Sequence, residues 1–246
     1  MKATALEFRL RFLIHGIIYV IGFTAPWDYA LHLDSIRTWQ WLAAWSSRTG
    51  WFGFSGATTA VLALGIVLAL AAALLRTWAT AYMGASIVKS AAMHGDRIVA
   101  DGPYRFLRNP LYVGLFLNTL ALALLMPPTG AAFCIVILGF FELRLIAAEE
   151  SFLTAQKGEP YLAYCARVPR VLPALTPRLP ASGARAHWLT ALLGEIYFWG
   201  AFISFASLGW GYNAVRIVQG VLISLGLSII VRAFLPKAVS PPLPSE

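Results

Sequence analysis

The chain has 246 residues, of which 59% are hydrophobic and only 12% are charged. A soluble domain carries about 25% charged residues, so we predict a single integral membrane domain over residues 1–246. The formal net charge of +8 does not indicate a nucleic-acid partner, because the positive residues are spread over short segments between apolar runs. The two cysteines, Cys134 and Cys165, suggest neither a disulfide nor a metal site. The four histidines show no ligand spacing, and each is expected at an interface or in a loop.

Six apolar runs predict an all-α protein, a polytopic bundle of about six transmembrane helices. The stretch from Ser35 to Phe54 contains four tryptophans, which is typical of a helix at the membrane surface. Pro26-Trp27-Asp28 fits the interfacial end of the first span better than a signal-peptide cleavage site. In chain order, the predicted spans are 12–31, 57–80, 110–126, 129–148, 187–208 and 213–234.

Proline and glycine mark the connections between these runs. Pro127-Pro128 predicts a tight hairpin, and Gly209-Trp-Gly211 predicts a turn between the last two spans. Residues 150–166 are expected to form a cytosolic helix with a break at Gly158-Glu-Pro160. An extended linker should follow, because prolines recur at positions 169, 173, 177 and 180.

Lysine and arginine set the predicted orientation. If the amino terminus is cytosolic, six spans place the 81–109 loop, the 149–187 loop and the carboxyl terminus on the cytosolic side as well. Only Arg37, Arg48 and Arg216 then fall on the other side, so we predict that both termini are cytosolic. Within the one domain we distinguish a catalytic core (80–173), a C-terminal transmembrane hairpin (187–235) and a disordered tail (236–246).

The first polar motif runs from Asp101 to Gly114. Asn109 followed by Pro110 predicts a helix start, with Asn as the N-cap and Pro at the first helical position. The free N–H groups and partial positive charge of that helix end predict an anion site, to which Arg105 and Arg108 add charge. The alternative is that both arginines only anchor the helix end to lipid headgroups.

The second polar motif begins at the end of the fourth predicted span, with Glu142, Arg144, Glu149 and Glu150. Acids inside or beside a membrane helix are costly and mark functional candidates. Glu142 and Glu149 are seven residues apart and share a helix face, whereas Arg144 does not share it. Either a pocket lies between the two faces or the helix is irregular there. The alternative is an interfacial charge network that reaches out to water.

Together the two motifs resemble the isoprenylcysteine carboxyl methyltransferase family and the related membrane phospholipid methyltransferases. The matching residues are Gly102-Pro-Tyr-Arg-x-x-Arg-Asn-Pro-x-Tyr-x-Gly114, then Glu149-Glu150, then Gly158-x-x-Tyr161-x-x-Tyr164-x-x-x-Val168-Pro169. The resemblance covers roughly residues 80 to 173 and implies an S-adenosylmethionine pocket at the cytosolic membrane face. The family most often has His at the position of Asn109, and an amide cannot accept a proton near neutral pH.

The resemblance implies catalytic roles for Arg144 and Glu149. The cofactor's carboxylate needs positive donors, and its sulfonium and ammonium charges need carboxylates or aromatic faces. The sequence lacks the Gly-rich loop of a soluble Rossmann methyltransferase, which fits a separate type of site. The candidate cofactor-binding residues are Tyr104, Arg105, Arg108, Asn109, Pro110, Tyr112, Gly114, Glu150, Tyr161 and Tyr164.

The expected function is methyl transfer from S-adenosylmethionine to a lipophilic acceptor that enters from the lipid bilayer. A prenylated cysteine carboxylate, a phospholipid amine and a smaller lipophilic thiol or acid all remain open as acceptors. Two other classes remain open too. One is an NADPH-dependent membrane reductase of the sterol reductase-like fold, and the other is a non-enzymatic membrane protein.

Overall fold

The computed structural model describes residues 2–24, 36–50, 53–84 and 99–234, apart from the side chain of Arg232. Within these ranges the regular structure is helical throughout and contains no strand, which confirms the all-α prediction. The predicted interfacial end at Pro26-Trp27-Asp28, the start of the 81–109 loop from residue 85 to 98 and the 236–246 tail lie outside the described residues.

Three described helices are long and apolar enough to cross a membrane. They are α5 (Phe54–Met83), α8 (Pro128–Lys157) and α12 (Ala214–Phe234). A 30-residue helix such as α5 or α8 is about 45 Å long, which exceeds the hydrocarbon core of about 30 Å. The protein is therefore a multi-pass membrane protein by the length and composition of its helices.

The other three predicted spans take different forms. Helices α2 (Arg11–Thr24) and α7 (Pro110–Ala123) are apolar but have only 14 residues each. The run from 187 to 208 is broken into α10 (Trp188–Gly194) and α11 (Ile196–Ile203), which meet at a bend of 65°. This pair counts as a fourth span if it crosses the membrane as one broken helix. Six spans therefore stay a prediction.

The breaks between the helices follow the proline and glycine signals. Pro127 lies in the turn of the α7–α8 hairpin, as the N-cap residue of α8. The π-helical turn η2 (Ser204–Leu208) and the 3-10 turn η3 (Gly209–Gly211) lead from α11 to α12. Helix α8 runs on to Lys157, so the predicted span 129–148 and the first part of the helix predicted from residue 150 form one continuous helix. The break itself falls where it was predicted, because Gly158 takes a positive φ of 57° before α9 (Glu159–Arg167).

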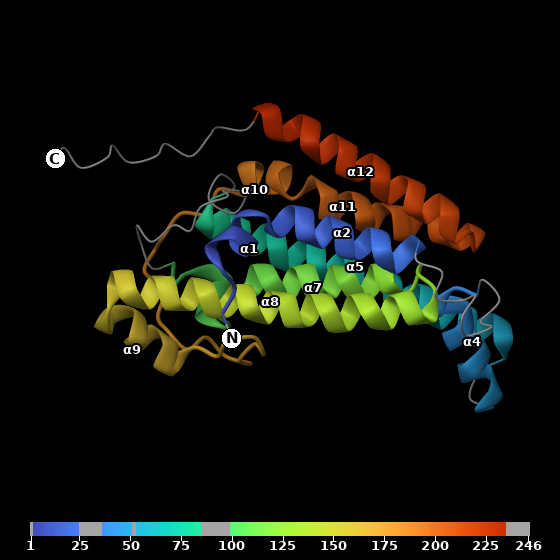
Figure 1. Cartoon of the computed structure of the whole chain (residues 1–246), viewed down its shortest axis with the longest axis horizontal. Coiled ribbons are helices and arrows are strands. Elements are labelled where there is room, and N and C mark those ends of the chain that lie inside the picture. Colours follow the sequence, from blue (N-terminus) through green and yellow to red (C-terminus); the bar gives the residue numbers. More distant parts are fainter. Residues whose placement is uncertain (1, 25–35, 51–52, 85–98, 235–246) are drawn as a thin grey trace.

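Two shorter helices complete the chain. Helix α1 (Ala5–Arg9) begins with a capping box, in which the Thr4 hydroxyl accepts from the Glu7 N–H and the Glu7 carboxylate accepts from the Thr4 N–H. Helix α4 (Thr38–Arg48) occupies the tryptophan-rich stretch that was expected to be helical. It projects from the right-hand end of the bundle in Figure 1.

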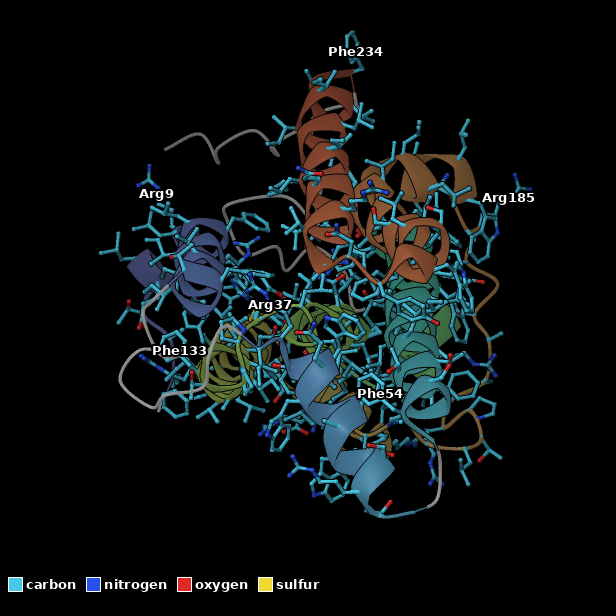
Figure 2. The ribbon with its side chains drawn as sticks, turned by 90° about the vertical axis from the view of Figure 1, so that its right-hand side faces the viewer. Arg9, Arg37, Phe54, Phe133, Arg185 and Phe234 are labelled. Atoms are coloured by element: carbon cyan, nitrogen blue, oxygen red, sulfur yellow. The ribbon has the colours of Figure 1, made fainter. Side chains whose placement is uncertain are left out.

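The long helices pack in sequence across the bundle. α5 contacts α7, α7 contacts α8 and α8 contacts α2, while α10 and α11 contact α5 and α12 contacts α11. Viewed from the α4 side, α2 and α8 lie on the left of the molecule and α5 and α11 on the right (Figure 2). We call the end at which α5 ends and α7 begins the Pro110 end, and the opposite end, where α4 lies, the Trp39 end (Figure 1).

The segments predicted to share one side of the membrane meet at the Pro110 end. The Ala3 N–H donates to the Arg144 carbonyl at 3.1 Å, and the His187 N–H donates to the Ala81 carbonyl at 2.8 Å. The amino-terminal residues therefore contact α8, and the end of the 149–187 segment contacts the end of α5. The orientation of this end relative to the membrane stays a prediction.

The α2–α8 interface depends on a close backbone contact. A Cβ atom on Gly130 would overlap the Gly22 carbonyl, and one on Gly22 would overlap the Cys134 sulfur. Cys134 donates to the Ile18 carbonyl at 3.3 Å at the same interface. Small residues at these positions let the two helices approach closely, as is common between membrane helices.

We predict that Gly130→Ala destabilises the protein by about 1–3 kcal/mol, because the added methyl group forces the two backbones apart. Gly226→Ala in α12 is the matched control, since a Cβ there meets no atom within 4 Å. Thermal unfolding of the two variants in detergent tests this. Equal melting temperatures would contradict the close-contact interpretation.

Candidate active site at the Pro110 end

Glu150, near the end of α8, accepts hydrogen bonds from three side chains. Its Oε1 atom lies 3.1 Å from Asn109 Nδ2 and 3.2 Å from Arg108 Nη1. Its Oε2 atom lies 2.9 Å from Arg170 Nε and 2.7 Å from Arg170 Nη2. Glu150 is only 7% exposed, and a buried carboxylate needs such partners. This Glu150 clamp ties the start of α7 and the segment after α9 to α8.

Asn109 has a different role from the predicted one. Helix α7 does start with Asn109 at the N-cap position and Pro110 inside the first turn. The Asn109 side chain makes no cap hydrogen bond, however, and its Nδ2 donates to Glu150 and to the Arg170 carbonyl, the latter at 3.0 Å. A charged acceptor forms a stronger bond than a capping contact, so the amide turns toward the carboxylate.

Arg105 and Arg108 already have partners within the protein. Arg105 Nε donates to the Leu179 carbonyl at 2.7 Å. Arg108 bonds Glu150 through Nη1, and its backbone N–H donates to the Pro169 carbonyl at 2.8 Å. The Arg108 Nε is buried and has no hydrogen-bond partner among the described residues. Of the two arginines, Arg108 therefore keeps one N–H donor that no described residue uses.

The segment from residue 169 to 187, which we call the strap, contains no helix or strand and bends at several points. Asp101 fastens it, because the carboxylate accepts from the Ser182 hydroxyl, from the Ser182 N–H at 2.8 Å and from the Ala184 N–H at 3.1 Å. These hydrogen bonds, led by the one from the Ser182 side chain, hold the pKa of Asp101 below its ordinary value. The Ala174 N–H adds a bond of 2.9 Å to the Phe106 carbonyl.

Three buried tyrosines pack α9 against the 3-10 turn η1 (Gly102–Arg105). The Tyr164 hydroxyl donates to the Tyr104 carbonyl at 2.9 Å, and the Tyr161 and Tyr164 ring centroids are 5.9 Å apart. Burial raises the pKa of all three phenols above the ordinary value. They therefore stay neutral and act as hydrogen-bond donors and apolar surface.

Glu149 and Tyr112 form the contact between α8 and α7. The Tyr112 hydroxyl donates to Glu149 Oε2 at 3.1 Å, and both residues are half-buried. The Arg11 guanidinium of α2 attracts Glu149 electrostatically. Arg11 is itself buried, and its guanidinium lies 4.3 Å above the Phe8 ring. The three residues Arg11, Tyr112 and Glu149 are the Glu149 cluster.

Arg144 does not lie beside Glu149. Helix α8 is regular from Pro128 to Lys157, which excludes the irregular-helix alternative. Arg144 Nη2 pairs with Glu7 Oε2 of α1 at 2.9 Å and with the Lys2 carbonyl at 3.2 Å. The two residues expected to be catalytic therefore face different neighbours, α1 for Arg144 and α7 for Glu149.

Glu142 faces α2 instead of water. Its Oε1 atom lies 3.8 Å from Nε2 of His15, and Glu142 and His15 are 4% and 8% exposed. The His15 ring also packs on Phe141, with ring centroids 5.3 Å apart. The expectation that every histidine lies at an interface or in a loop is therefore wrong for His15.

The sequence reasoning missed a buried ion pair between α5 and the start of α11. Arg76 Nε lies 2.6 Å from Glu195 Oε2, and Arg76 Nη2 lies 3.0 Å from Glu195 Oε1. Thr80 donates to the same carboxylate at 2.7 Å, and Arg76 Nη1 donates to the Leu111 carbonyl at 3.1 Å. Gly114 makes room for this arginine, because a Cβ there would lie 2.5 Å from Arg76 Cγ. The sequence signal for this ion pair was one charged residue inside each of two apolar runs, Arg76 in 57–80 and Glu195 in 187–208.

An apolar crevice lies at the opposite, Trp39 end of the bundle. Its walls include Trp39, Leu62, Leu124, Phe205 and Tyr212. The prediction of a cofactor pocket refers to the Pro110 end, so this crevice does not correspond to it.

Comparison with known proteins finds similarity to methyltransferases over part of the chain. Residues 59–158 match the phospholipid methyltransferase family. The chain is also 34% identical over 89 residues to the protein-S-isoprenylcysteine O-methyltransferase of Schizosaccharomyces pombe. That match covers 35% of this chain and 37% of the relative, so the chain spans only about a third of the length of the relative. No solved structure matches the chain.

The matches confirm the resemblance drawn from the two motifs: residues 59–158 are similar to the phospholipid methyltransferase family, and a part of the chain is similar to an isoprenylcysteine methyltransferase. The matched residues 59–158 include most of α5 and all of α7 and α8, and with them Arg76, Tyr112, Glu149 and Glu150. Helices α1 and α2 lie outside them.

We predict that Arg76→Met destabilises the protein by about 3–5 kcal/mol, because it leaves the Glu195 carboxylate buried without its main partner. The double variant Arg76→Met with Glu195→Leu removes both charges and should recover most of that loss. Thermal unfolding in detergent measures both. A double variant as unstable as the single one would show that the ion pair is not what holds α11 to α5.

We predict that acid loosens the strap. The pKa of Asp101 in the folded protein lies below the unfolded value of about 3.9, so its contribution to stability is complete above about pH 4. That contribution is lost as the pH falls through the folded pKa. Hydrogen exchange of the Ser182 and Ala184 amides, corrected for intrinsic rates, should therefore accelerate below about pH 4. In Asp101→Asn this pH step should be absent, and a step that persists would assign it to another group.

Proposed function

We propose that this chain is an integral membrane methyltransferase that transfers a methyl group from S-adenosylmethionine to a lipophilic acceptor. The observation that carries the proposal is the contact between Glu149 and Tyr112 within the matched family region. It puts a carboxylate and an aromatic ring where two apolar helices reach the polar Pro110 end. A carboxylate beside an aromatic face suits a cation such as a sulfonium or an ammonium group.

The side chains at this end fit the charges of the proposed cofactor. Arg108 Nε is a buried donor without a partner among the described residues, and it suits the amino-acid carboxylate of the cofactor. Glu149 accepts a hydrogen bond from the neutral phenol of Tyr112, and its negative charge suits the cofactor's positive groups. S-adenosylmethionine, when bound, supplies an electrophilic methyl group on a positively charged sulfur.

The remaining proposed cofactor-binding residues would shape and hold the site. Asn109, Pro110 and Glu150 fix the start of α7 relative to α8, and Gly114 lets α5 approach α7. Tyr104, Arg105, Tyr161 and Tyr164 hold the turn, α9 and the strap in place. Much of the catalysis would come from positioning the acceptor in line with the methyl group. Arg144, which pairs with Glu7, would act on the acceptor side if its carboxylate partner is displaced.

The two alternative classes are less well supported. A dinucleotide reductase would need several cations for the phosphates, but Arg105, Arg108 and Arg170 are engaged by protein groups. A non-enzymatic role does not account for the match to a methyltransferase family.

Calorimetry on the detergent-purified protein tests the proposal. We expect S-adenosylmethionine to bind in the micromolar range, about −8 kcal/mol. Glu149→Gln removes a charge without a change of shape and should weaken binding about tenfold, as expected for the loss of a charged hydrogen bond. If Glu149 faces the sulfonium, the demethylated product should be affected less than the donor.

The matched control is Glu159→Gln, which changes an exposed carboxylate at the start of α9 and should leave binding unchanged. Absence of binding to the unaltered protein, together with clear binding of NADPH, would overturn the methyltransferase proposal.

A further inference from the structure

The middle of the strap runs beside the turn that precedes α7. The Arg178 N–H donates to the Arg105 carbonyl at 2.8 Å, and Arg105 Nε donates to the Leu179 carbonyl at 2.7 Å. Helix α7, which begins at Pro110, contains no charged residue, whereas three of the nine residues before it are charged. A chain with this change of composition passes from polar surroundings into the hydrocarbon core at that point. The middle of the strap therefore lies at the level at which α7 enters the bilayer.

The end of the strap is held at the end of another apolar helix. The His187 N–H donates to the Ala81 carbonyl at 2.8 Å, two residues before α5 ends at Met83. The next residue, Trp188, begins α10 and is 50% exposed. Tryptophan is enriched at the boundary between membrane and water. The strap, which passes from α9 to α10 at this end of the bundle (Figure 1), therefore follows the bilayer surface.

Two of the three leucines of the strap are not packed against the protein. Leu172 is 80% exposed, and Leu175 is fully exposed. They lie outside the helices, so the lipid-facing side of a spanning helix does not account for their exposure. The third leucine, Leu179, is half-buried against the tyrosines of α9. Leucines at the bilayer surface remove apolar area from water when they enter the lipid, which favours insertion of the two exposed side chains.

The charge of the strap and of the residues just before it is entirely positive. Residues 161–187 contain four arginines, at positions 167, 170, 178 and 185, and no Asp or Glu. All four are exposed, and Arg185 lies at the outer edge of the molecule in Figure 2. Arg170 pairs with Glu150, whereas the other three form no ion pair with any described residue. Their charge is therefore available to an anionic partner outside the protein.

We propose that the strap binds anionic phospholipid headgroups of the bilayer that the helices cross. Leu172 and Leu175 insert below the headgroups, and Arg167, Arg178 and Arg185 bind phosphate oxygens, which the planar guanidinium group suits. Each arginine held near an anionic membrane surface contributes about fivefold in affinity. The inference does not depend on the proposed function, because it concerns only the strap and the bilayer.

The first test compares the full chain in nanodiscs of phosphatidylcholine with the full chain in nanodiscs that contain equal parts of phosphatidylcholine and phosphatidylglycerol. Hydrogen exchange of the Ala174 and Arg178 amides, which donate to the Phe106 and Arg105 carbonyls, reports opening of the strap. Exchange should be at least about tenfold slower in the anionic discs, because lipid binding stabilises the closed strap. At 1 M salt most of this difference should disappear, since the screening length falls to about 3 Å.

The variants decide whether the strap itself causes the difference. A negative surface also slows exchange by repelling hydroxide, but this contribution is the same in every variant. After correction for intrinsic rates, Arg178→Gln and Arg185→Gln should each reduce the difference between the two discs about fivefold. Arg48→Gln is the matched control, because it removes an exposed arginine of α4 at the Trp39 end. An equal lipid effect in the control and the strap variants would overturn the proposal.

The second test measures insertion of the leucines. A nitroxide is attached at Leu175→Cys, with Cys165→Ser to remove the more accessible native thiol. The label should collide with oxygen, which dissolves in lipid, and should be shielded from a water-soluble nickel chelate. A label at Glu159→Cys, an exposed position at the start of α9, should show the opposite preference.

Thermal unfolding of each labelled variant checks that the fold is kept. Equal access of the nickel chelate to both labels would overturn the proposal and would leave the leucines to a water-soluble partner instead. The two tests use different variants, so a variant that does not fold leaves the other test decisive, and a negative result in either overturns the proposal.

Discussion

A carboxylate buried in an apolar bundle must be matched by cations or hydrogen-bond donors, and Glu150 meets this constraint by holding three segments together. Its carboxylate binds Arg108 and Asn109 at the start of α7, and Arg170 in the segment that follows α9. Because these contacts fix α7, α8 and the strap relative to one another, they also fix the Tyr112–Glu149 contact one residue away along α8. The candidate site therefore depends on a charge cluster in which Glu150 is matched by side chains of the protein itself.

The same constraint determines which charges remain for chemistry. Arginines that look available in the sequence are neutralised by the protein: Arg76 by Glu195, Arg144 by Glu7, and Arg108 and Arg170 by Glu150. Two carboxylates on one face of α8 have other neighbours: Glu142 faces His15, and Glu149 accepts from Tyr112 and is attracted by Arg11. The charges of this face are therefore shared with α2 and α7, apart from the Glu150 clamp.

Local patterns predicted most of the helices but few of their contacts. Some helix boundaries depend on the backbone alone, namely those at Pro110, Pro128 and Gly158. These boundaries could therefore be predicted from the sequence. The bend between α10 and α11 falls at Gly194 and Glu195, inside an apolar run that was predicted as one span. The charged end of α8 was predicted as a separate helix, although it continues α8 to Lys157. The pairing of Arg76 with Glu195 joins positions 119 residues apart and depends on packing, which no single-sequence pattern specifies.

The amino-terminal segment shows why the site is larger than its family motif. Glu7, Arg11 and His15 are spaced four residues apart and contact or attract Arg144, Glu149 and Glu142 of α8. This spacing repeats about once per helical turn, so a single face of the segment meets a single long helix. The segment precedes the matched region 59–158, which in our proposal holds the donor. It thus adds charged and titratable residues to this end of α8 that the Glu150 clamp does not contain.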